Sequence, residues 1–258
     1  MKIAMNMKVL SIAVVLGVWA LPTAALEEHK PLSDATIKTL VEHRLIKRGL
    51  QRDTNIQVSV EDQVVVLQGA VRSLAEKKQA ERQANRVMDV SRVENHLSIE
   101  APERSDQQIA DDLARAIRRF VFYDIFDWLE GQVRDGVVTL KGSVREPWRK
   151  ADYGRLAEAV TGVSQVTNEI QILPNSIYDD QIRIAAARSI YGHPSFRRYA
   201  NRSLPPIHIV VDRGRVILKG AVATKLERQL AGILVRTRVL TFEVVNDLTV
   251  DTEMPKRM

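Results

Sequence analysis

Three short apolar stretches of the chain share one pattern and end in Leu-x-Gly-x-Val. They occupy residues 64–71, 137–144 and 215–222. Their valine and isoleucine content favours β-strands, because β-branched side chains pack well on a pleated sheet. A second apolar segment precedes each of them across a short polar turn, at residues 56–60, 128–134 and 207–212. The pattern therefore predicts three β-hairpins.

A second motif follows each hairpin and contains an asparagine within an apolar segment. The asparagines are Asn95, Asn168 and Asn246, and the same number of residues separates each of them from the glycine of its hairpin. Three identical spacings indicate that one unit has been repeated along the chain. A last strand is expected through each asparagine motif.

A helical pattern opens each unit. Asp34, Asp106 and Asp179 are followed by apolar residues three, seven and eleven positions later. This period places the apolar side chains on one face of a helix, and an aspartate at the start favours the N-cap position. The sequence therefore predicts three amphipathic helices, each capped by its aspartate.

A second helix is expected four residues after each of the three glycines. Ser73 with Glu76 and Thr224 with Glu227 have the S/T-x-x-E pattern of a capping box. The middle copy instead has Pro147 at the first helical position. The unit therefore has the order α-β-β-α-β.

The predicted fold class is α+β, built from three tandem modules. Each module is expected to be a small three-stranded mixed sheet packed with two helices, and the modules span residues 34–100, 105–173 and 179–250. Short linkers at 101–104 and 173–176 contain a proline, which favours extended chain. The third module is longer because of a loop at residues 191–206.

These motifs resemble the BON domain family, whose modules were first recognised in osmotically induced periplasmic and nodulation-associated bacterial proteins. The resemblance rests on Leu-x-Gly-x-Val and on Val-x-Asn-x-Leu/Ile, and it covers nearly all of the chain after the N-terminal segment. The third copy departs from the pattern through its longer loop. The resemblance implies the α-β-β-α-β fold, binding to phospholipid or other envelope components, and a role in envelope or osmotic stress protection. It implies no catalytic residues.

The marker residues of the motifs are expected to serve the fold. Gly69, Gly142 and Gly220 fit a strand position where the chain packs closely and a side chain would not fit. The three asparagines fit hydrogen bonds to nearby backbone at a strand entry. No binding residue is therefore carried over from the resemblance.

The N-terminal segment has the layout of a secretory signal. Lys2 and Lys8 precede an apolar run at 9–21, and small residues at 23–25 form a cleavage site. The sequence predicts cleavage near Ala25 and a periplasmic protein that is soluble or peripheral to the membrane. The alternative is an uncleaved anchor, although the run is shorter than the roughly 20 residues of a spanning helix. The chain has no cysteine, which excludes disulfides, cysteine-ligated metals and a lipoprotein anchor.

No known catalytic pattern occurs in the sequence. The five histidines are scattered over the chain, and His43 and His208 are interpreted as structural or solvated side chains. Paired aspartates at 111–112 and 179–180 lie in predicted first helical turns, where the helix dipole accounts for them. The sequence therefore predicts a non-enzymatic protein that uses no metal and no cofactor.

Basic charge is concentrated in the third module. Residues 179–250 contain 12 basic and 6 acidic side chains, and 10 of the basic ones are arginine. Arginine binds phosphate in a bidentate manner, which favours an anionic phospholipid surface as the partner. Nucleic acid would satisfy the same electrostatics, but a periplasmic compartment argues against it.

The long loop of the third module mixes aromatic and basic residues and is the first candidate lipid-binding site. Two interpretations fit this composition. Either the rings reach headgroup depth while the arginines meet phosphates, or the rings cover the module's own core and the arginines are solvated. The candidate residues are Phe196, Arg197, Arg198, Tyr199 and Arg202.

A weaker candidate patch lies in the second module, where aromatic residues at 120–128 have basic neighbours. The alternative is that most of these rings fill the core of that module. The candidate residues are Arg118, Arg119, Trp148, Arg149 and Lys150.

Two functions follow from these observations. The first is a membrane-surface binder in which three weak modules act together. The second is a scaffold or chaperone-like partner that contacts envelope proteins through strand edges and helix faces. The sequence leaves open the oligomeric state and the orientation of the modules.

Overall fold

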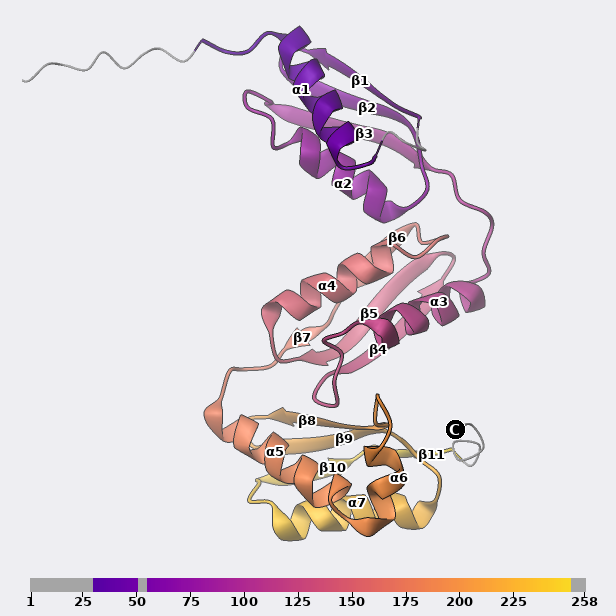
Figure 1. The fold of residues 1–258 in the computed structure, drawn as a ribbon, viewed down its shortest axis with the longest axis vertical. Coiled ribbons are helices and arrows are strands. Elements are labelled where there is room, and N and C mark those ends of the chain that lie inside the picture. The colour runs from indigo at the N-terminus through magenta and orange to yellow at the C-terminus, as the bar shows by residue number, and fades with distance from the viewer. Residues whose placement is uncertain (1–29, 51–54, 252–258) are drawn as a thin grey trace, which may run out of the picture. The chain divides into compact units, whose positions relative to one another are not determined.

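The computed structural model describes residues 30–50 and 55–251. The predicted signal segment lies outside these residues. Among the residues that the structure describes, no helix has the length and apolar character needed to cross a bilayer. Figure 1 shows the chain as three modules, each a small sheet with helices packed against it.

Each module has the predicted order of helices and strands. The first contains α1 (Asp34–Lys47), β1 (Asn55–Glu61), β2 (Val64–Val71), α2 (Leu74–Ala84) and β3 (Arg92–Ile99). The second contains α3 (Asp106–Arg119), β4 (Trp128–Arg134), β5 (Val137–Val144), α4 (Pro147–Glu158), β6 (Gln165–Asn168) and β7 (Gln171–Ile172). The third contains α5 (Ile177–Tyr191), η1 (Pro194–Phe196), α6 (Arg197–Ala200), β8 (Ile207–Asp212), β9 (Arg215–Val222), α7 (Lys225–Arg238), β10 (Glu243–Asn246) and β11 (Thr249–Val250). The α+β class is confirmed, although the last strand is interrupted in the second and third modules.

The three sheets share one topology. The central strand, β2, β5 or β9, is antiparallel to the strand before it and parallel to the last strand of its module. A parallel neighbour requires a crossover connection, which α2, α4 and α7 provide. The mixed three-stranded sheet expected for each module is therefore present, with β7 and β11 continuing the interrupted last strands.

Each module has its own buried core between its helices and its sheet. The predicted helical positions Ile37, Val41 and Leu45 are fully buried in the first module. The leucine two residues before the marker glycine is also fully buried in every module. The hydrophobic period of the sequence therefore identified the inward faces correctly.

The marker glycines lie where a side chain cannot fit. Gly69, Gly142 and Gly220 have positive φ angles of 113°, 123° and 104°. A Cβ at Gly69 would overlap the carbonyl oxygen of Asn55 on the neighbouring strand, and the other two glycines face a carbonyl oxygen in the same way. The close packing expected at these positions is confirmed.

The marker asparagines join the last strand to the second helix. In each case Nδ2 donates to a backbone carbonyl of that helix, and Oδ1 accepts from the N–H two residues further on. The carbonyl acceptors are Lys77, Lys150 and Arg228, at 3.0, 2.7 and 2.6 Å. The expected hydrogen bonds to nearby backbone are therefore confirmed, with the helix as an additional partner, but the asparagines lie within or at the end of a strand and not at its entry.

The three aspartates are not N-caps, so this prediction was wrong. Serines cap the first helices, and the aspartate side chains instead reach the hairpin turn of their module. There each carboxylate accepts hydrogen bonds from two successive backbone N–H groups. The donors lie 28 to 35 residues away along the chain, so a local helix signal could not reveal them.

Candidate membrane-binding surface

The third module exposes four large apolar side chains at one end. Ile177, Tyr178, Leu240 and Phe242 are exposed by 75, 79, 95 and 91%. Side chains of this size seldom cluster on a surface without a partner, so the cluster indicates a contact site.

Two of these side chains belong to two additional residues at the start of α5. The helix begins at Ile177, and its N-cap Ser176 accepts from the N–H of Asp179. In the first two modules a serine immediately precedes the aspartate and caps the helix. Because α5 starts earlier, Ile177 and Tyr178 lie within its first turn and are exposed there.

The other two lie in the connection between α7 and β10. Its ends are fixed, because Val239 is buried and the N–H of Phe242 donates to the carbonyl of Gly214 at 3.0 Å. The hydroxyl of Thr241 donates to the same carbonyl. These contacts therefore fix the connection in the conformation that exposes Leu240 and Phe242.

A groove runs between these two segments, and we call it the third-module groove. Its volume is about 660 Å³, within the range of roughly 300–1,000 Å³ typical of small-ligand pockets. The apolar part of its lining comes from Tyr178, Ile182, Ala185, Val239, Leu240 and Phe242. Its polar members include Asp179 and Arg213.

The carboxylate of Asp179 is already engaged in the fold. It accepts from the N–H of Arg213 at 2.9 Å and from the N–H of Gly214 at 2.7 Å, and it is 2% exposed. The guanidinium of Arg213 has no acidic partner among the described residues, and the residue is exposed. The groove therefore combines an apolar interior with a basic side chain at its edge.

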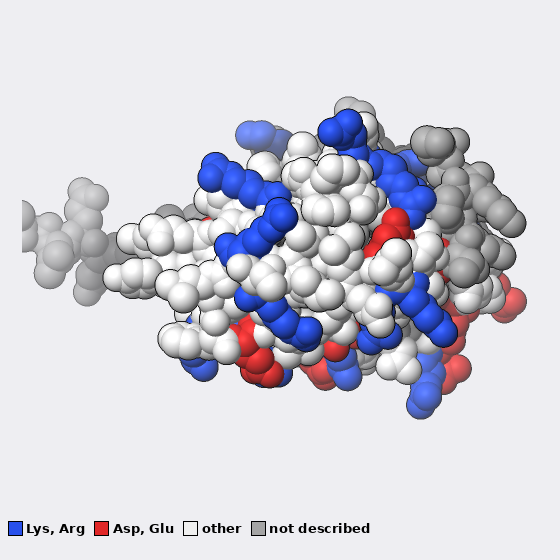
Figure 2. All heavy atoms as spheres, turned by 90° about the horizontal axis from the view of Figure 1, so that it is seen from below, with Lys and Arg blue, Asp and Glu red and all other residues white. Residues whose placement is uncertain are grey.

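Basic side chains also cover the helices beside the groove. Arg188 of α5 and Arg228, Arg236 and Arg238 of α7 are exposed. Figure 2 views the lower end of Figure 1, where these helices lie, and shows Lys and Arg spread over a largely uncharged face. Most Asp and Glu side chains in that view lie toward its margins.

The same helices expose further apolar side chains, namely Ile184, Leu226 and Ile233. We call the outer side of α5 and α7, together with residues 239–242, the apolar-basic face. Its acidic side chains are largely engaged, since Asp180 pairs with Arg183 at 2.7 Å and Glu227 pairs with Arg198. The face therefore has an excess of positive charge around exposed apolar groups.

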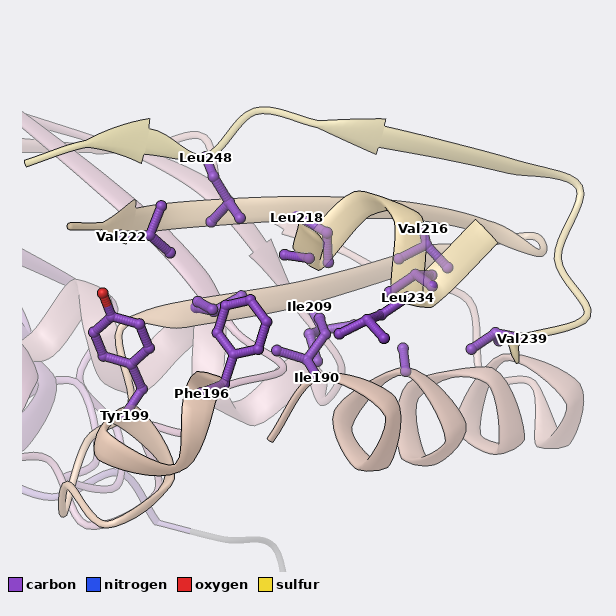
Figure 3. Close-up of a cluster of buried hydrophobic side chains, with 14 of the residues drawn as sticks. Ile190, Phe196, Tyr199, Ile209, Val216, Leu218, Val222, Leu234, Val239 and Leu248 are labelled. Carbon is purple, nitrogen blue, oxygen red and sulfur yellow. The ribbon is translucent and has the colours of Figure 1, made fainter. Parts of the chain in front are cut away.

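The first candidate site does not present its aromatic rings. Phe196 and Tyr199 are buried in the core of the third module, and Figure 3 shows both within the buried cluster. The prediction that these rings reach headgroup depth is therefore contradicted, and the interpretation that they cover the core is the one observed. The longer loop folds into η1 and α6, which carry the rings inward.

Two of the three arginines of that loop contact Tyr199. Arg198 donates to the Tyr199 hydroxyl at 3.0 Å and pairs with Glu227. The guanidinium carbon of Arg202 lies 5.5 Å from the Tyr199 ring centroid. Arg197 is exposed. Lipid binding by these three arginines stays a prediction.

The weaker candidate patch is divided by the fold. Arg149 is buried and contacts Asp124, Asp127 and Glu146 at 2.6 to 3.1 Å, so its place on a surface patch was wrong. Burial of a guanidinium requires such carboxylate partners. The remaining four residues keep at least part of their surface, with Arg118, Arg119 and Trp148 exposed and Lys150 half-buried.

Trp148 instead belongs to a small exposed aromatic group. Its ring centroid lies 5.0 Å from that of Phe122, and Val121 beside them is exposed. Phe120 and Tyr123 pack against the core of the second module, as the alternative interpretation expected. Ile125 and Phe126 pack against the core of the third module, which the sequence did not indicate.

A buried polar cluster lies where residues 123–128 meet strand β8. The carbonyl of Asp127 accepts from Nδ1 of His208 at 2.6 Å, and the carbonyl of Ile125 accepts from the N–H of Ile209 at 2.7 Å. The side chain of Asp127 accepts from Arg149 at 2.6 Å and from the Tyr153 hydroxyl at 2.9 Å. His208 is therefore a structural side chain, as interpreted from the sequence.

Burial shifts the titration of this cluster. It raises the pKa of Asp127 to about 6, although the hydrogen bond from Arg149 acts in the opposite direction. Burial also lowers the pKa of His208 and raises the pKa of Tyr123 to about 12. No pattern in the sequence indicates this cluster, because its members are spread over two modules and no motif joins them.

The structure offers no metal-binding group in its described part, where no three His, Asp or Glu side chains converge suitably.

Comparisons with known proteins agree with the repeated architecture. The BON domain model matches residues 33–101, 105–174 and 197–252. Osmotically-inducible protein Y of Escherichia coli (strain K12) is 29% identical over 146 residues, which cover 54% of this chain and 73% of that protein. Two solved structures of CdsD, a structural protein of the type III secretion system of Chlamydia trachomatis, are 14% identical, and one covers 86% of this chain and 99% of its own at a TM-score of 0.23. That TM-score is too low to support an argument. Because the three domain matches together extend over most of its length, this chain belongs to the BON domain family.

Proposed function

We propose that this protein is a periplasmic, stress-related BON protein whose third module binds the surface of anionic phospholipid membranes. The observation that supports this best is the apolar-basic face, where exposed Tyr178, Leu240 and Phe242 lie among arginines. A lipid surface suits this combination, because apolar side chains can enter the boundary between headgroups and acyl chains while arginines contact phosphates.

The energetics of such a contact are sufficient for reversible attachment. Full burial of a large apolar side chain contributes about 1.5–3 kcal/mol, and each basic side chain near an anionic leaflet contributes about 1 kcal/mol. Partial insertion of a few exposed side chains, together with several arginines, therefore reaches the roughly 8 kcal/mol of micromolar binding.

The compartment and the biological context rest on other observations. The predicted signal at residues 1–25 supports export. Membership of the BON family and similarity to an osmotically inducible protein support a role in envelope stress.

Sedimentation with liposomes tests the proposal directly. We expect the protein to pellet with anionic vesicles at low salt, to be released as salt rises, and to remain in the supernatant with zwitterionic vesicles. The double variant Leu240→Ser/Phe242→Ser should bind at least tenfold more weakly. A matched control is Met88→Ser/Val121→Ser, which removes exposed apolar side chains from the first and second modules. No pelleting at low salt, or equal losses in both variants, would contradict the proposal.

A second candidate function is contact with an envelope protein. It is favoured by the exposed group of Val121, Phe122 and Trp148, which lies on a module without excess positive charge. Exposed aromatic rings are typical of protein interfaces. Crosslinking in the periplasm that Trp148→Ser abolishes, with liposome binding unchanged, would support this function.

A further inference from the structure

We infer that the third-module groove holds one acyl chain of an anionic amphiphile, with the headgroup beside Arg213. This inference rests on the proposed function, because it describes how the same module would recognise a lipid. It goes beyond attachment to a surface, since it predicts a saturable site for a single lipid molecule.

Both walls of the groove differ from the corresponding segments of the first two modules. Hydrogen bonds align the connection before the last strand in each module, because the N–H of Phe242, Ser164 and Ser91 donates to the carbonyl of the preceding hairpin turn. The large ring of Phe242 therefore occupies a position where the other two modules have serine.

The opposite wall differs in the same way. Ser33 and Ser105 immediately precede the aspartates of the first two modules, whereas Tyr178 has that position in the third. At both edges of the groove, the third module thus has an aromatic residue where the first two modules have serine. Two such replacements on facing segments indicate a shaped site rather than scattered surface apolarity.

The corresponding region of the second module is built differently. Its hollow is lined by Asp135, Ser164 and the linker residues 101–105, which include charged side chains. A Cβ at Gly162 would come within 2.9 Å of the Cβ of Arg104, so the linker approaches the connection closely there. That hollow has apolar members in Ile99, Pro102 and Val163, but no aromatic side chain lines it, in contrast to the third-module groove.

The interior of the groove suits a hydrocarbon chain. Ile182, Ala185 and Val239 line it, and the buried carboxylate of Asp179 is satisfied by two backbone N–H groups. The Thr241 hydroxyl is also engaged, with the carbonyls of Gly214 and Glu243. An extended peptide would bury unpaired backbone groups against these walls, whereas an acyl chain has none to satisfy.

Charge selects the headgroup. Arg213 is the basic side chain in the lining, and its guanidinium has no acidic partner among the described residues. A carboxylate or phosphate beside it would gain a charge-assisted hydrogen bond. One groove with one such cation fits an amphiphile with a single chain, such as a fatty acid or a lysophospholipid.

A fluorescent fatty acid provides the test. The full protein is titrated with 11-(dansylamino)undecanoic acid below its critical micelle concentration, and we expect saturable binding of one molecule per protein. Unlabelled lysophosphatidylglycerol should displace the probe. Ala185→Phe fills the groove and should weaken binding at least tenfold, whereas Ala200→Phe places the same ring on an exposed part of the module and should not. Arg213→Gln should weaken binding of the dansyl fatty acid but not binding of an uncharged dansyl alcohol.

Two further measurements keep the result interpretable. Tyr178→Ser/Phe242→Ser introduces residues that the other modules carry at these places, so it should preserve folding and still weaken probe binding. Liposome sedimentation of Ala185→Phe should be nearly unchanged, because the outer side of the face is intact. Vesicle binding without probe binding, or equal probe binding by Ala185→Phe and Ala200→Phe, would overturn the acyl-chain site and leave the proposed function standing.

Discussion

The first and third modules have the same internal contacts and different surfaces. In both, an aspartate of the first helix binds the hairpin turn, and the marker asparagine binds the second helix. At the groove, however, Ser91 of the first module corresponds to Phe242 of the third. The difference shows that the repeated residues maintain the fold, while exposed positions beside the turn are free to acquire a binding role.

The two junctions between modules also differ. Between the first and second modules, Lys78 pairs with Glu158 at 2.6 Å at a partly exposed site, and Leu74 of α2 is buried in the core cluster of the second module. Between the second and third modules, Phe126 packs against the third core and His208 is buried against Asp127. Both junctions therefore join an apolar side chain of one module to the core of the next, and the junction of the second and third modules adds the buried hydrogen bonds of His208 and Ile209.

The largest effect on the fold that the modules share is expected when a marker glycine is replaced by alanine. Gly69→Ala, Gly142→Ala and Gly220→Ala should each destabilise their module by at least about 3 kcal/mol, because Cβ would overlap a backbone carbonyl and φ is positive. Gly49→Ala is the matched control, since φ is 74° there but no atom lies within 4 Å of the new Cβ. It should cost only about 1 kcal/mol. Thermal denaturation measures both, and similar losses at all four glycines would refute the packing argument.

The next largest effect is expected from the aspartates, and it should distinguish the modules. Asp179→Ala leaves two backbone N–H groups without an acceptor, one of them buried, and should cost about 2–3 kcal/mol. Asp34→Ala should cost about 1 kcal/mol, because its turn is more exposed and water can replace the carboxylate. Chemical denaturation compares the two variants. If Asp34→Ala were the more destabilising, burial would not be the deciding factor.

A smaller effect should appear on acidification, at the junction of the second and third modules. The raised pKa of Asp127, from 3.8 to about 6, gives stability that is fully present below pH 3.8 and is lost as pH rises through about 6. The lowered pKa of His208 acts oppositely, since its stability is present above pH 6.5 and is lost as pH falls.

Variants of the two residues separate these contributions. When the pH falls from 7 to 5, the free energy of unfolding of Asp127→Asn should decrease by about 1 kcal/mol more than that of the unaltered protein. The reason is that asparagine cannot take up the proton that stabilises the folded state at the lower pH. The free energy of unfolding of His208→Gln should decrease less than that of the unaltered protein over the same interval. The measurement is the thermal midpoint at each pH, and parallel profiles for all three proteins would show that neither group titrates as its burial requires.

The smallest effect on stability is expected from the arginines of residues 197–202. Replacing Arg197, Arg198 and Arg202 by alanine should weaken binding to anionic liposomes through the lost charge. The thermal midpoint should fall only slightly, because the Arg198–Glu227 pair is partly exposed and such pairs contribute about 0.2–1 kcal/mol. Unchanged sedimentation would place the site on the apolar-basic face of α5, α7 and residues 239–242, without these arginines.

Local sequence patterns predicted most of the fold and little of the candidate site. Ile37, Val41 and Leu45 are buried as their spacing requires, because helical period alone sets which face is apolar. The composition at 191–206 left the orientation of Phe196 and Tyr199 open, because interleaved aromatic and basic residues fit a buried and an exposed arrangement equally well, and both rings are buried. Only the path of η1 and α6 decides between them.

The sequence by itself determined the three repeats, their order of helices and strands, and the excess of arginine in the third, since each is a property of residues close together in the chain. Tertiary structure alone decided the role of the aspartates, the contact of Asp127 with His208 and the third-module groove. These features join segments that are distant in sequence, and their free energy depends on burial and distance, which no local pattern contains.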